Sequence, residues 1–448
     1  MSEVRSNIER VKSILVHSVE RAKPLLKDLH PSDLADILEE ITPESRMILF
    51  KMLPVETASD AISEMDEDSN PEELLLSISP QRAAKIIEEL DPDDAADLLA
   101  QLPRSDLRLI MERLGDEEEK VIQSLMTYDE DSAGGLMNPD VLAIPEDWTK
   151  RQAMEEVIRI SEEMEDFYAI YVVDDENRLQ GVVPLKRLIR ARPHTRIGEL
   201  LAENLVTVFV EMDQEEVAQT ILKYNLAAVP VVDTENHLLG RITFDDIMDV
   251  LQEESTEDIL KIAGVSEDED LDGGWVAAVR SRLPWLLINL CTASTAGFVI
   301  SRFSNAIDQL VLIASFMPIV AGVAGNGATQ ALAVTIRRIA TEGIVPKQYV
   351  SVVVKELAVG LTNGILLGLV VGLVAWWLGG NPLLGLVVLA AMIGNLLVAG
   401  FAGSAIPLFL QRLGVDPAVA SSILMTAFTD ILGYTLLLGL ASLILGLT

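Results

Sequence analysis

The chain is poor in the residues that build most metal and redox sites. It has one cysteine, Cys291, and four histidines in 448 residues. A single cysteine excludes an intrachain disulfide and every multi-cysteine zinc cluster. No Gly-rich phosphate loop and no nucleophile–base constellation is found, so the sequence predicts no enzyme. The charged N-terminus lacks an apolar core, which predicts that there is no cleavable signal peptide.

Positive charge is scarce in the first part of the chain, and charge of either sign is scarce in the rest. From Trp275 onward there are 5 acids and 8 bases, whereas the first 274 residues hold 64 acids and 26 bases, a net charge of −38. Such an acidic part argues against a nucleic-acid partner, because nucleic acids bind basic patches. It favours divalent cations as ligands, or simply a solvated surface.

Residues 1–130 are predicted to form an acidic domain of short helices. A residue followed by Pro marks the expected boundaries, at His30-Pro31, Thr42-Pro43, Ser79-Pro80, Asp91-Pro92 and Leu102-Pro103. Pro at the first helical position after a Ser, Thr or Asp cap is a helix-start signal. Helices this short are not stable alone and must stack, so we expect an all-α superhelix. Asp93 and Asp97, spaced i, i+4, share one helix face, either a solvated face or an ion site.

Residues 131–252 contain an internal repeat. The segment AIYVVDDENRLQGVVPLKRLI, from Ala169, matches AVPVVDTENHLLGRITFDDIM, from Ala228, at an offset of 59. Each copy reads as a buried strand, a polar turn, a Gly-containing strand and a helix, preceded by an amphipathic helix. This order resembles a tandem pair of CBS domains, an α/β regulatory module that often binds adenine nucleotides.

The resemblance extends to one nucleotide contact. The pattern with which CBS domains contact ribose, a Thr followed three residues later by an Asp, is matched by Thr243 and Asp246. The first repeat has Pro184 and Arg187 at these positions. The resemblance therefore implies ATP as a modulator, bound at Thr243 and Asp246.

Residues 244–280 are predicted to be an acidic connecting (plug) helix that overlaps the end of the repeat pair. One basic residue, Lys261, faces seven acids in its first part: Asp245, Asp246, Asp249, Glu253, Glu254, Glu257 and Asp258. Like charges at i, i+4 oppose a helix, and bound divalent cations would remove that repulsion. Mg²⁺ takes oxygen ligands and keeps much of its water. The segment is an ion site or an exposed charged linker, and VSEDEDLDGG is a loop before Trp275.

Residues 281–448 are predicted to be a membrane domain of five helices. The uncharged apolar runs are Leu283–Ser301, Leu310–Ile336, Leu357–Leu378, Leu383–Leu410 and Val419–Leu447. Each run meets the requirement of roughly 20 residues for a spanning helix in lipid. Seven basic residues flank one side and only Arg302 flanks the other. This bias predicts a multi-pass protein of the cell (inner) membrane with cytoplasmic N-terminal domains and an outside C-terminus.

Two spans carry unusual residues. The second, PIVAGVAGNGATQALAVTIRR, is expected to be broken at Gly322, Gly325, Asn326 and Gly327, either for close helix packing or to line a pore. The fifth contains Asp430, the only charged residue between Pro417 and the C-terminus. A carboxylate in a span is costly and usually faces a bundle interior or a water-filled path. Asp430 is therefore an interhelical hydrogen-bonding group or a cation site, and the broken second span favours the cation site.

With PIVAGVAGNGATQ and TAFTDILG in these spans, the whole chain resembles the MgtE family of magnesium channels. The resemblance implies a homodimer with a pore at its two-fold axis, in which Asp430 of each subunit holds hydrated Mg²⁺. The pore lining that it implies is Pro318, Gly322, Gly325, Asn326, Gln330 and Thr426. It also implies cytosolic Mg²⁺-sensing acids that close the pore when Mg²⁺ is high. These are Asp93, Asp97, Glu215, Asp246, Asp249, Glu254, Glu257 and Asp258.

The sequence departs from the family pattern at three places. GNGATQA stands where GNAGTQS is commoner, Ile423 stands where a Pro is common, and Asn225 stands where some members have an acid. Two other functions fit the residues. One is an exchanger that couples a divalent cation such as Mg²⁺, Mn²⁺ or Co²⁺ to H⁺ or Na⁺ at Asp430. The other is a membrane-anchored sensor of cations or nucleotides.

Overall fold

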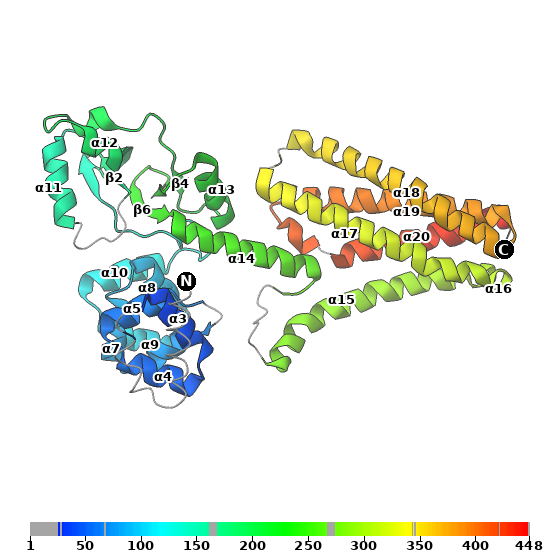
Figure 1. Ribbon diagram of the computed structural model, residues 1–448, viewed down its shortest axis with the longest axis horizontal. Helices are drawn as coiled ribbons and strands as arrows, with labels where there is room; N and C mark the ends of the chain where they lie inside the picture. Colours follow the sequence, from blue (N-terminus) through cyan, green and yellow to red (C-terminus); the bar gives the residue numbers. More distant parts are fainter. Residues whose placement is uncertain are drawn as a thin grey trace. The chain divides into compact units, whose positions relative to one another are not determined.

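The computed structural model describes residues 26, 29–66, 69–160, 168–266, 274–342, 344, 346–420 and 422–446. The chain divides into two compact units, Met1–Gln252 and Glu253–Thr448. The first unit contains a helical array and an α/β repeat pair, and the second contains the long apolar helices (Figure 1). The predicted fold class is confirmed: a helical superhelix, a tandem α/β pair, a connecting helix and a helical membrane part.

The array consists of short helices joined by tight turns. They are α3 (Pro31–Glu40), α4 (Pro43–Met52), α5 (Val55–Ser63), α6 (Glu72–Leu76), α7 (Pro80–Ile87), α8 (Pro92–Ala100), α9 (Arg104–Met111) and α10 (Asp116–Leu125). Four of the Pro residues begin a helix and Pro103 immediately precedes one, as predicted. In these described helices the predicted Ser, Thr and Asp caps make no cap hydrogen bond. The fixed φ of Pro therefore marks these starts without help from a side chain.

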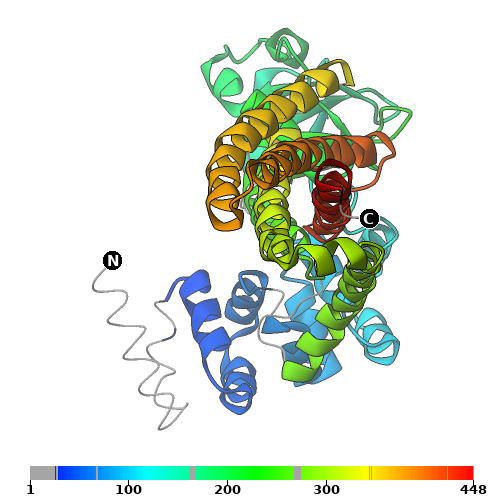
Figure 2. The same cartoon turned by 90° about the vertical axis from the view of Figure 1, so that its right-hand side faces the viewer.

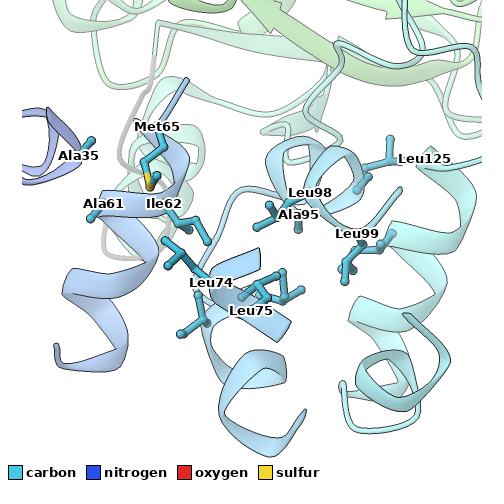
Figure 3. Packing of buried hydrophobic residues seen from close by; sticks show 14 of the residues in the cluster. Ala35, Ala61, Ile62, Met65, Leu74, Leu75, Ala95, Leu98, Leu99 and Leu125 are labelled. Carbon is cyan, nitrogen blue, oxygen red and sulfur yellow. The ribbon is translucent and has the colours of Figure 1, made fainter. Parts of the chain in front are cut away.

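Apolar side chains from successive helices hold the array together. Figure 3 shows Ile62 of α5, Leu74 and Leu75 of α6 and Leu98 and Leu99 of α8 meeting in one buried layer. Each of these helices has fewer than three turns, so its own hydrogen bonds give little stability. The shared core is what makes the helices form, and it fixes the position of α8, which carries Asp93 and Asp97.

The repeat pair contains two three-stranded sheets of the same topology. The first consists of β1 (Ala143–Pro145), β2 (Ala169–Val173) and β3 (Leu179–Pro184), and the second of β4 (Val208–Phe209), β5 (Ala228–Val232) and β6 (Leu238–Thr243). In each sheet the first strand is parallel to the second, and the second is antiparallel to the third. The helices of the pair are α11 (Lys150–Ile160), α12 (Leu185–Arg190), η2 (Ile197–Leu200) and α13 (Gln214–Tyr224).

The predicted offset of 59 holds even at irregular positions. The register shifts between Val172 and Val173 in the first sheet and between Val231 and Val232 in the second. The turn of each copy donates a hydrogen bond to the other copy. Asn177 Nδ2 donates to the Leu238 carbonyl at 3.0 Å, and Asn236 Nδ2 donates to the Leu179 carbonyl at 2.7 Å. Both Asn residues have positive φ, which Asn tolerates well. The two copies therefore form a pseudo-symmetric pair.

The connecting helix is α14 (Phe244–Ala263), and it is shorter than the predicted segment 244–280. It ends where Gly264 adopts a φ of +76° and the Val265 N–H donates to the Leu260 carbonyl at 2.9 Å. This left-handed Gly is a common helix stop. Most of the predicted loop from Val265 to Gly274 lies outside the described residues.

The second unit has five helices long and apolar enough to cross a membrane, as predicted. They are α15 (Trp275–Ser301), α17 (Met317–Glu342), α18 (Tyr349–Gly379), α19 (Pro382–Arg412) and α20 (Ser422–Leu445). Short elements join them: α16 (Ser304–Gln309), η3 (Val311–Phe316), η4 (Pro346–Gln348) and η5 (Pro417–Ala420). In Figures 1 and 2, α15 and α18 lie on opposite sides of this bundle. The most buried span is α19, which packs against α17, α18 and α20.

The predicted break in the second span is wrong. Helix α17 is continuous from Met317 to Glu342 and passes through every glycine of the segment. A Gly in a helix costs about 1 kcal/mol relative to Ala, which packing can offset. A Cβ on Gly327 would lie 3.0 Å from Leu396 of α19, so this Gly permits close contact between the helices. The glycines therefore leave α17 without side chains at these positions and do not interrupt the helix.

Candidate functional site

One face of α17 is exposed along most of its length. Pro318, Gly322, Asn326 and Gln330 follow each other at intervals of four residues, and all four are exposed in the subunit. Residues at this spacing lie on one helix face. Asn and Gln side chains are poorly suited to lipid, so such a face in a membrane requires a protein partner or water. The structure thus aligns four of the six predicted pore residues in one stripe, here called the α17 stripe.

Asp430 is half-buried on α20, next to the same part of α17. Its neighbour Thr429 is fully buried, and a Cβ on Gly325 would lie 3.8 Å from Thr429 Oγ1. This packing sets Asp430 at the level of Gly325 and the α17 stripe. Thr426 is one turn before Asp430 and is also half-buried. The structure thus puts the two remaining pore residues, Gly325 and Thr426, near Asp430 but outside the stripe.

Asn395 of α19 contacts both α17 and α20. It is fully buried, and its Nδ2 donates to the Val320 carbonyl of α17 at 3.1 Å. A Cβ on Gly433 of α20 would lie 2.3 Å from the same Nδ2 atom. The amide is therefore wedged between α17 and α20, and any side chain at residue 433 would displace it. Sequence reasoning missed this residue, although an Asn in an apolar run was a visible signal.

A group of acids gathers where α8 meets the beginning of α14, within the first unit. Asp93 is only 9% exposed, and its Oδ1 atom is buried without a hydrogen-bond partner among the described residues. A buried polar atom without a partner costs free energy, so this oxygen is suited to a proton or a cation. The interpretation of Asp93 as part of a solvated face is therefore wrong. We call Asp93, Asp94, Asp246 and Asp249 the acid cluster.

Crowding raises the pKa of every carboxyl group in the acid cluster. Burial, followed by the charges of Asp94 and Asp246, raises the pKa of Asp93 well above its usual value. Asp94 is exposed to solvent, but the density of protein around its carboxyl group, followed by the charges of Asp91 and Asp246, raises its pKa to about 7. Burial is also the main cause of the raised pKa values of Asp246 and Asp249. The full negative charge of the cluster is thus costly without a compensating cation.

Asp246 already has a local structural role. Its Oδ2 atom accepts hydrogen bonds from the Thr243 N–H at 2.9 Å and from Thr243 Oγ1 at 2.7 Å. These bonds join β6 to the beginning of α14. The two residues predicted to contact a nucleotide are therefore in hydrogen-bond contact, and the charge of Asp246 also raises the pKa values of Asp93 and Asp94.

The remaining acids of the first unit are less tightly grouped. Asp97 is half-buried one turn after Asp93, and its charge contributes to the raised pKa of Asp94. Glu215 lies on α13, away from these carboxylates in the sequence, and accepts from Gln219 Nε2 at 3.3 Å. Asn225 ends α13 with a φ of +50°, a conformation that Asn tolerates better than an acid with a longer side chain.

A second acidic group lies at the end of α14, within the second unit. Lys261 Nζ contacts Glu257 and lies 2.8 Å from Asp416 Oδ2 in the turn before α20. Burial, followed by the charges of Asp416 and Glu254, raises the pKa of Asp258 to about 6. A Cβ on Gly264 would lie 3.3 Å from Ile423 Cδ1, so Ile423 packs against the end of the connecting helix. Asp258 thus interacts with Asp416, which sequence reasoning missed, and Lys261 links Asp416 to Glu257.

The structure does not unite all the predicted acids in one metal site. Within the described ranges, no three His, Cys, Asp or Glu residues have an arrangement that could hold a bare metal ion. The acids instead form two electrostatic groups, the acid cluster and the end of α14, while Glu215 belongs to α13 and Asp430 to α20. A hydrated Mg²⁺ needs only one or two carboxylates and water, so both groups remain suited to it.

These features are those of a membrane protein that combines an acidic helical array, a tandem α/β pair and five apolar helices, the last containing a carboxylate. Family models match this order. The MgtE intracellular N domain matches residues 29–131, the CBS domain matches residues 133–194 and 197–253, and the divalent cation transporter model MgtE matches residues 317–440.

Relatives cover nearly the whole chain. Magnesium transporter MgtE of Thermus thermophilus is 34% identical over 429 residues, which is 94% of this chain and 95% of the relative. Magnesium transporter MgtE of Bacillus subtilis is 32% identical, over 94% of this chain and 93% of the relative. The chain belongs to the MgtE family, and both of these relatives are named as magnesium transporters.

Two solved structures resemble the first part of the chain. The crystal structure of the soluble part of a magnesium transporter is 32% identical, with a TM-score of 0.51, and covers 55% of this chain and 99% of that chain. The cytosolic domain of the Mg²⁺ channel MgtE in complex with ATP is 35% identical, with the same TM-score, and covers 54% of this chain and 99% of that chain.

Proposed function

We propose that this chain is a magnesium channel of the cell membrane that admits Mg²⁺ and closes when cytosolic Mg²⁺ is high. The observation that carries the proposal is the half-buried Asp430 at the level of the exposed α17 stripe. The relatives named magnesium transporters over 94% of the chain support Mg²⁺ as the ion. The solved neighbour named as a Mg²⁺ channel supports a channel over an exchanger.

The pore would form between two copies of the chain. A polar stripe exposed on a membrane helix is satisfied if it faces the same stripe of a second subunit across water. Two Asp430 carboxylates would then flank the axis and favour a divalent ion. Because Mg²⁺ loses its water reluctantly, selection would act on the hydrated ion, aided by Asn326 and Gln330 as hydrogen-bonding walls. An inside-negative potential would drive entry.

The sensor would be the acid cluster together with the end of α14. The buried Asp93 Oδ1 atom and the raised pKa values of its neighbours fit a site that gains when a cation replaces protons. Mg²⁺ would supply the positive charge, and the carboxylates would hold it directly or through its water. Asp97 and Glu254 would contribute charge nearby rather than complete one cage, and Glu215 would contribute charge from α13.

Closure would be a shift between two populations. Mg²⁺ must bind the closed arrangement more tightly than the open one, since an ion with equal affinity shifts nothing. The neighbouring acids Asp258 and Asp416 would be bridged in the closed arrangement, where Lys261 already offsets part of their charge. The excess of basic residues at one side of the spans supports a cytoplasmic sensor. ATP, bound at Thr243 and Asp246, would modulate this equilibrium.

The decisive variant is Asp430→Ala, measured by Mg²⁺ flux into proteoliposomes. Loss of the axial charges should lower flux about a hundredfold or more, because a divalent ion loses two attractive charges in a weakly screened setting. Asp308→Ala, which removes an exposed carboxylate on α16, is the matched control and should keep normal flux. Normal flux in Asp430→Ala would refute the pore assignment. Flux that requires an opposing proton or sodium gradient would favour the exchanger.

A further inference from the structure

The second unit contains another carboxylate inside a spanning helix. Glu356 belongs to α18 and is only 8% exposed. It lies about 10 Å along the helix from Tyr349, given a rise of 1.5 Å per residue. The predicted apolar run began at Leu357, directly after Glu356, and so left this residue out of the span. Ionisable residues inside membrane spans are rare and usually face a bundle interior or a water-filled cavity.

Glu356 lines a cavity of about 260 Å³ that lies between α17, α18 and α19 and opens to the surface of the subunit. The polar groups of its wall are Gln330, Lys355, Glu356 and Asn363. Glycines bring the helices together here: a Cβ on Gly400 would lie 2.5 Å from the Glu356 carbonyl oxygen. This close approach of α18 to α19 buries Glu356, and the missing side chains leave room for the cavity.

The Glu356 carboxylate keeps its capacity to bind a ligand. Its nearest cation is Lys355 Nζ, 3.7 Å from Oε1, which is too long for a hydrogen bond. Adjacent helical residues do not face each other, and the Lys355 side chain is 59% exposed, so the ammonium lies towards the rim. No hydrogen bond to the Glu356 carboxylate is present among the residues that the structure describes.

We propose that Glu356 binds a hydrated divalent cation in this cavity, and that this is a second ion site of the membrane unit. The identification of the cation as Mg²⁺ rests on the proposed function. Six waters occupy roughly 180 Å³ at about 30 Å³ each, so a hexahydrated ion fits a cavity of about 260 Å³ without dehydration. Gln330 belongs to both the cavity wall and the α17 stripe. The site therefore adjoins the pathway on which Asp430 acts.

The site can be tested without measuring transport. In the full-length chain, Cys291→Ser removes the only native thiol, and Val334→Cys places a thiol on the cavity wall. The rate at which a small cationic methanethiosulfonate modifies this thiol is measured in proteoliposomes at increasing Mg²⁺. A neutral reagent of similar size is the matched control for access, and size-exclusion chromatography checks the fold of each variant.

We expect Mg²⁺ to slow modification by the cationic reagent, with a defined half-protecting concentration. Glu356→Gln should raise that concentration about tenfold or more through loss of one attractive charge. Lys355→Met should lower it by removing a competing cation, and Glu356→Asp should retain part of the protection. Opposite effects of the two neutralising changes would not arise from a purely structural role.

Two results would overturn the site. The first is an unchanged half-protecting concentration in Glu356→Gln. The second is protection that depends on anionic lipid and not on Mg²⁺, which would assign the cavity to a lipid headgroup. Asp430→Ala should lose flux but keep the protection, so loss of the cavity site and failure of the proposed pore give different results.

Discussion

The acid cluster and the membrane carboxylates use the same chemical group in opposite ways. In the first unit, α8 and α14 crowd several carboxylates whose pKa values are raised by burial and neighbouring charges, and an Asp93 oxygen has no hydrogen-bond partner among the described residues. In the second, Asp430 and Glu356 stand singly on different helices. A sensor benefits from repulsion that only an ion relieves, whereas a pathway benefits from isolated charges that a hydrated ion can leave.

The largest effect should come from neutralising the sensor while leaving the pathway intact. Asp246→Asn, Asp249→Asn and Glu257→Gln together remove three charges from α14. We expect the internal Mg²⁺ concentration that half-closes the channel to rise about a hundredfold, since each tenfold change needs only 1.4 kcal/mol. Patch recordings at stepped internal Mg²⁺ measure this half-closing concentration. Unchanged inhibition by internal Mg²⁺ would reject the sensor role of α14. The acid cluster and the membrane carboxylates would then not differ in function.

A single change at the buried acid should separate repulsion from ion binding. Because Asp93 has a raised pKa, its ionised form destabilises the fold, and Asp93→Asn should raise Tm in Mg²⁺-free buffer. The expected rise is a few degrees, on the scale of about 2–4 °C per kcal/mol. The same variant should lose most of the further rise in Tm that Mg²⁺ gives the wild type. Differential scanning calorimetry of the full chain measures both.

Glu117→Gln is the matched control for that experiment. Glu117 is an exposed acid on α10 of the same helical array. Its replacement should change neither Tm nor the Mg²⁺ response beyond the small effect typical of surface sites. A lower Tm in Mg²⁺-free Asp93→Asn would mean that Asp93 holds the fold by a contact, and the sensor account would lose its main support.

A smaller effect is expected from pH. Asp94 and Asp258 have pKa values of about 7 and about 6, above the ordinary 3.8. Raised carboxyl pKa values make protonation favour the folded state, so Mg²⁺-free protein should gain stability as pH falls from about 8 to about 5.5. Protons then compete with Mg²⁺, and the Tm increase caused by Mg²⁺ should shrink severalfold over this range. A Mg²⁺ response that grows as pH falls would contradict the raised pKa values.

Sequence patterns predicted the elements whose signals are local or periodic. Pro residues located the starts of α3, α4, α7, α8 and α9 in the array, and the offset of 59 located both sheets. The five spans followed from length and hydropathy alone. Each of these features depends on neighbouring residues, so no knowledge of tertiary contacts was needed.

Features that depend on packing could not be predicted in this way. The glycines of α17 suggested a break, but contact with α19 keeps the helix continuous. The spacing of Asp93 and Asp97 predicted that both lie on one helix face. The burial of Asp93 and its proximity to Asp246 depend on packing against the neighbouring repeat, which the spacing does not show. Glu356 was missed because counting uncharged runs discards any carboxylate at the boundary of a run.

The most direct test of the account is a current recording from the reconstituted wild-type chain under an Mg²⁺ gradient. The account predicts currents that reverse at the Mg²⁺ equilibrium potential and decline as Mg²⁺ on the cytosolic side rises. Currents that reverse instead with the proton or sodium gradient, or that ignore cytosolic Mg²⁺, would contradict it.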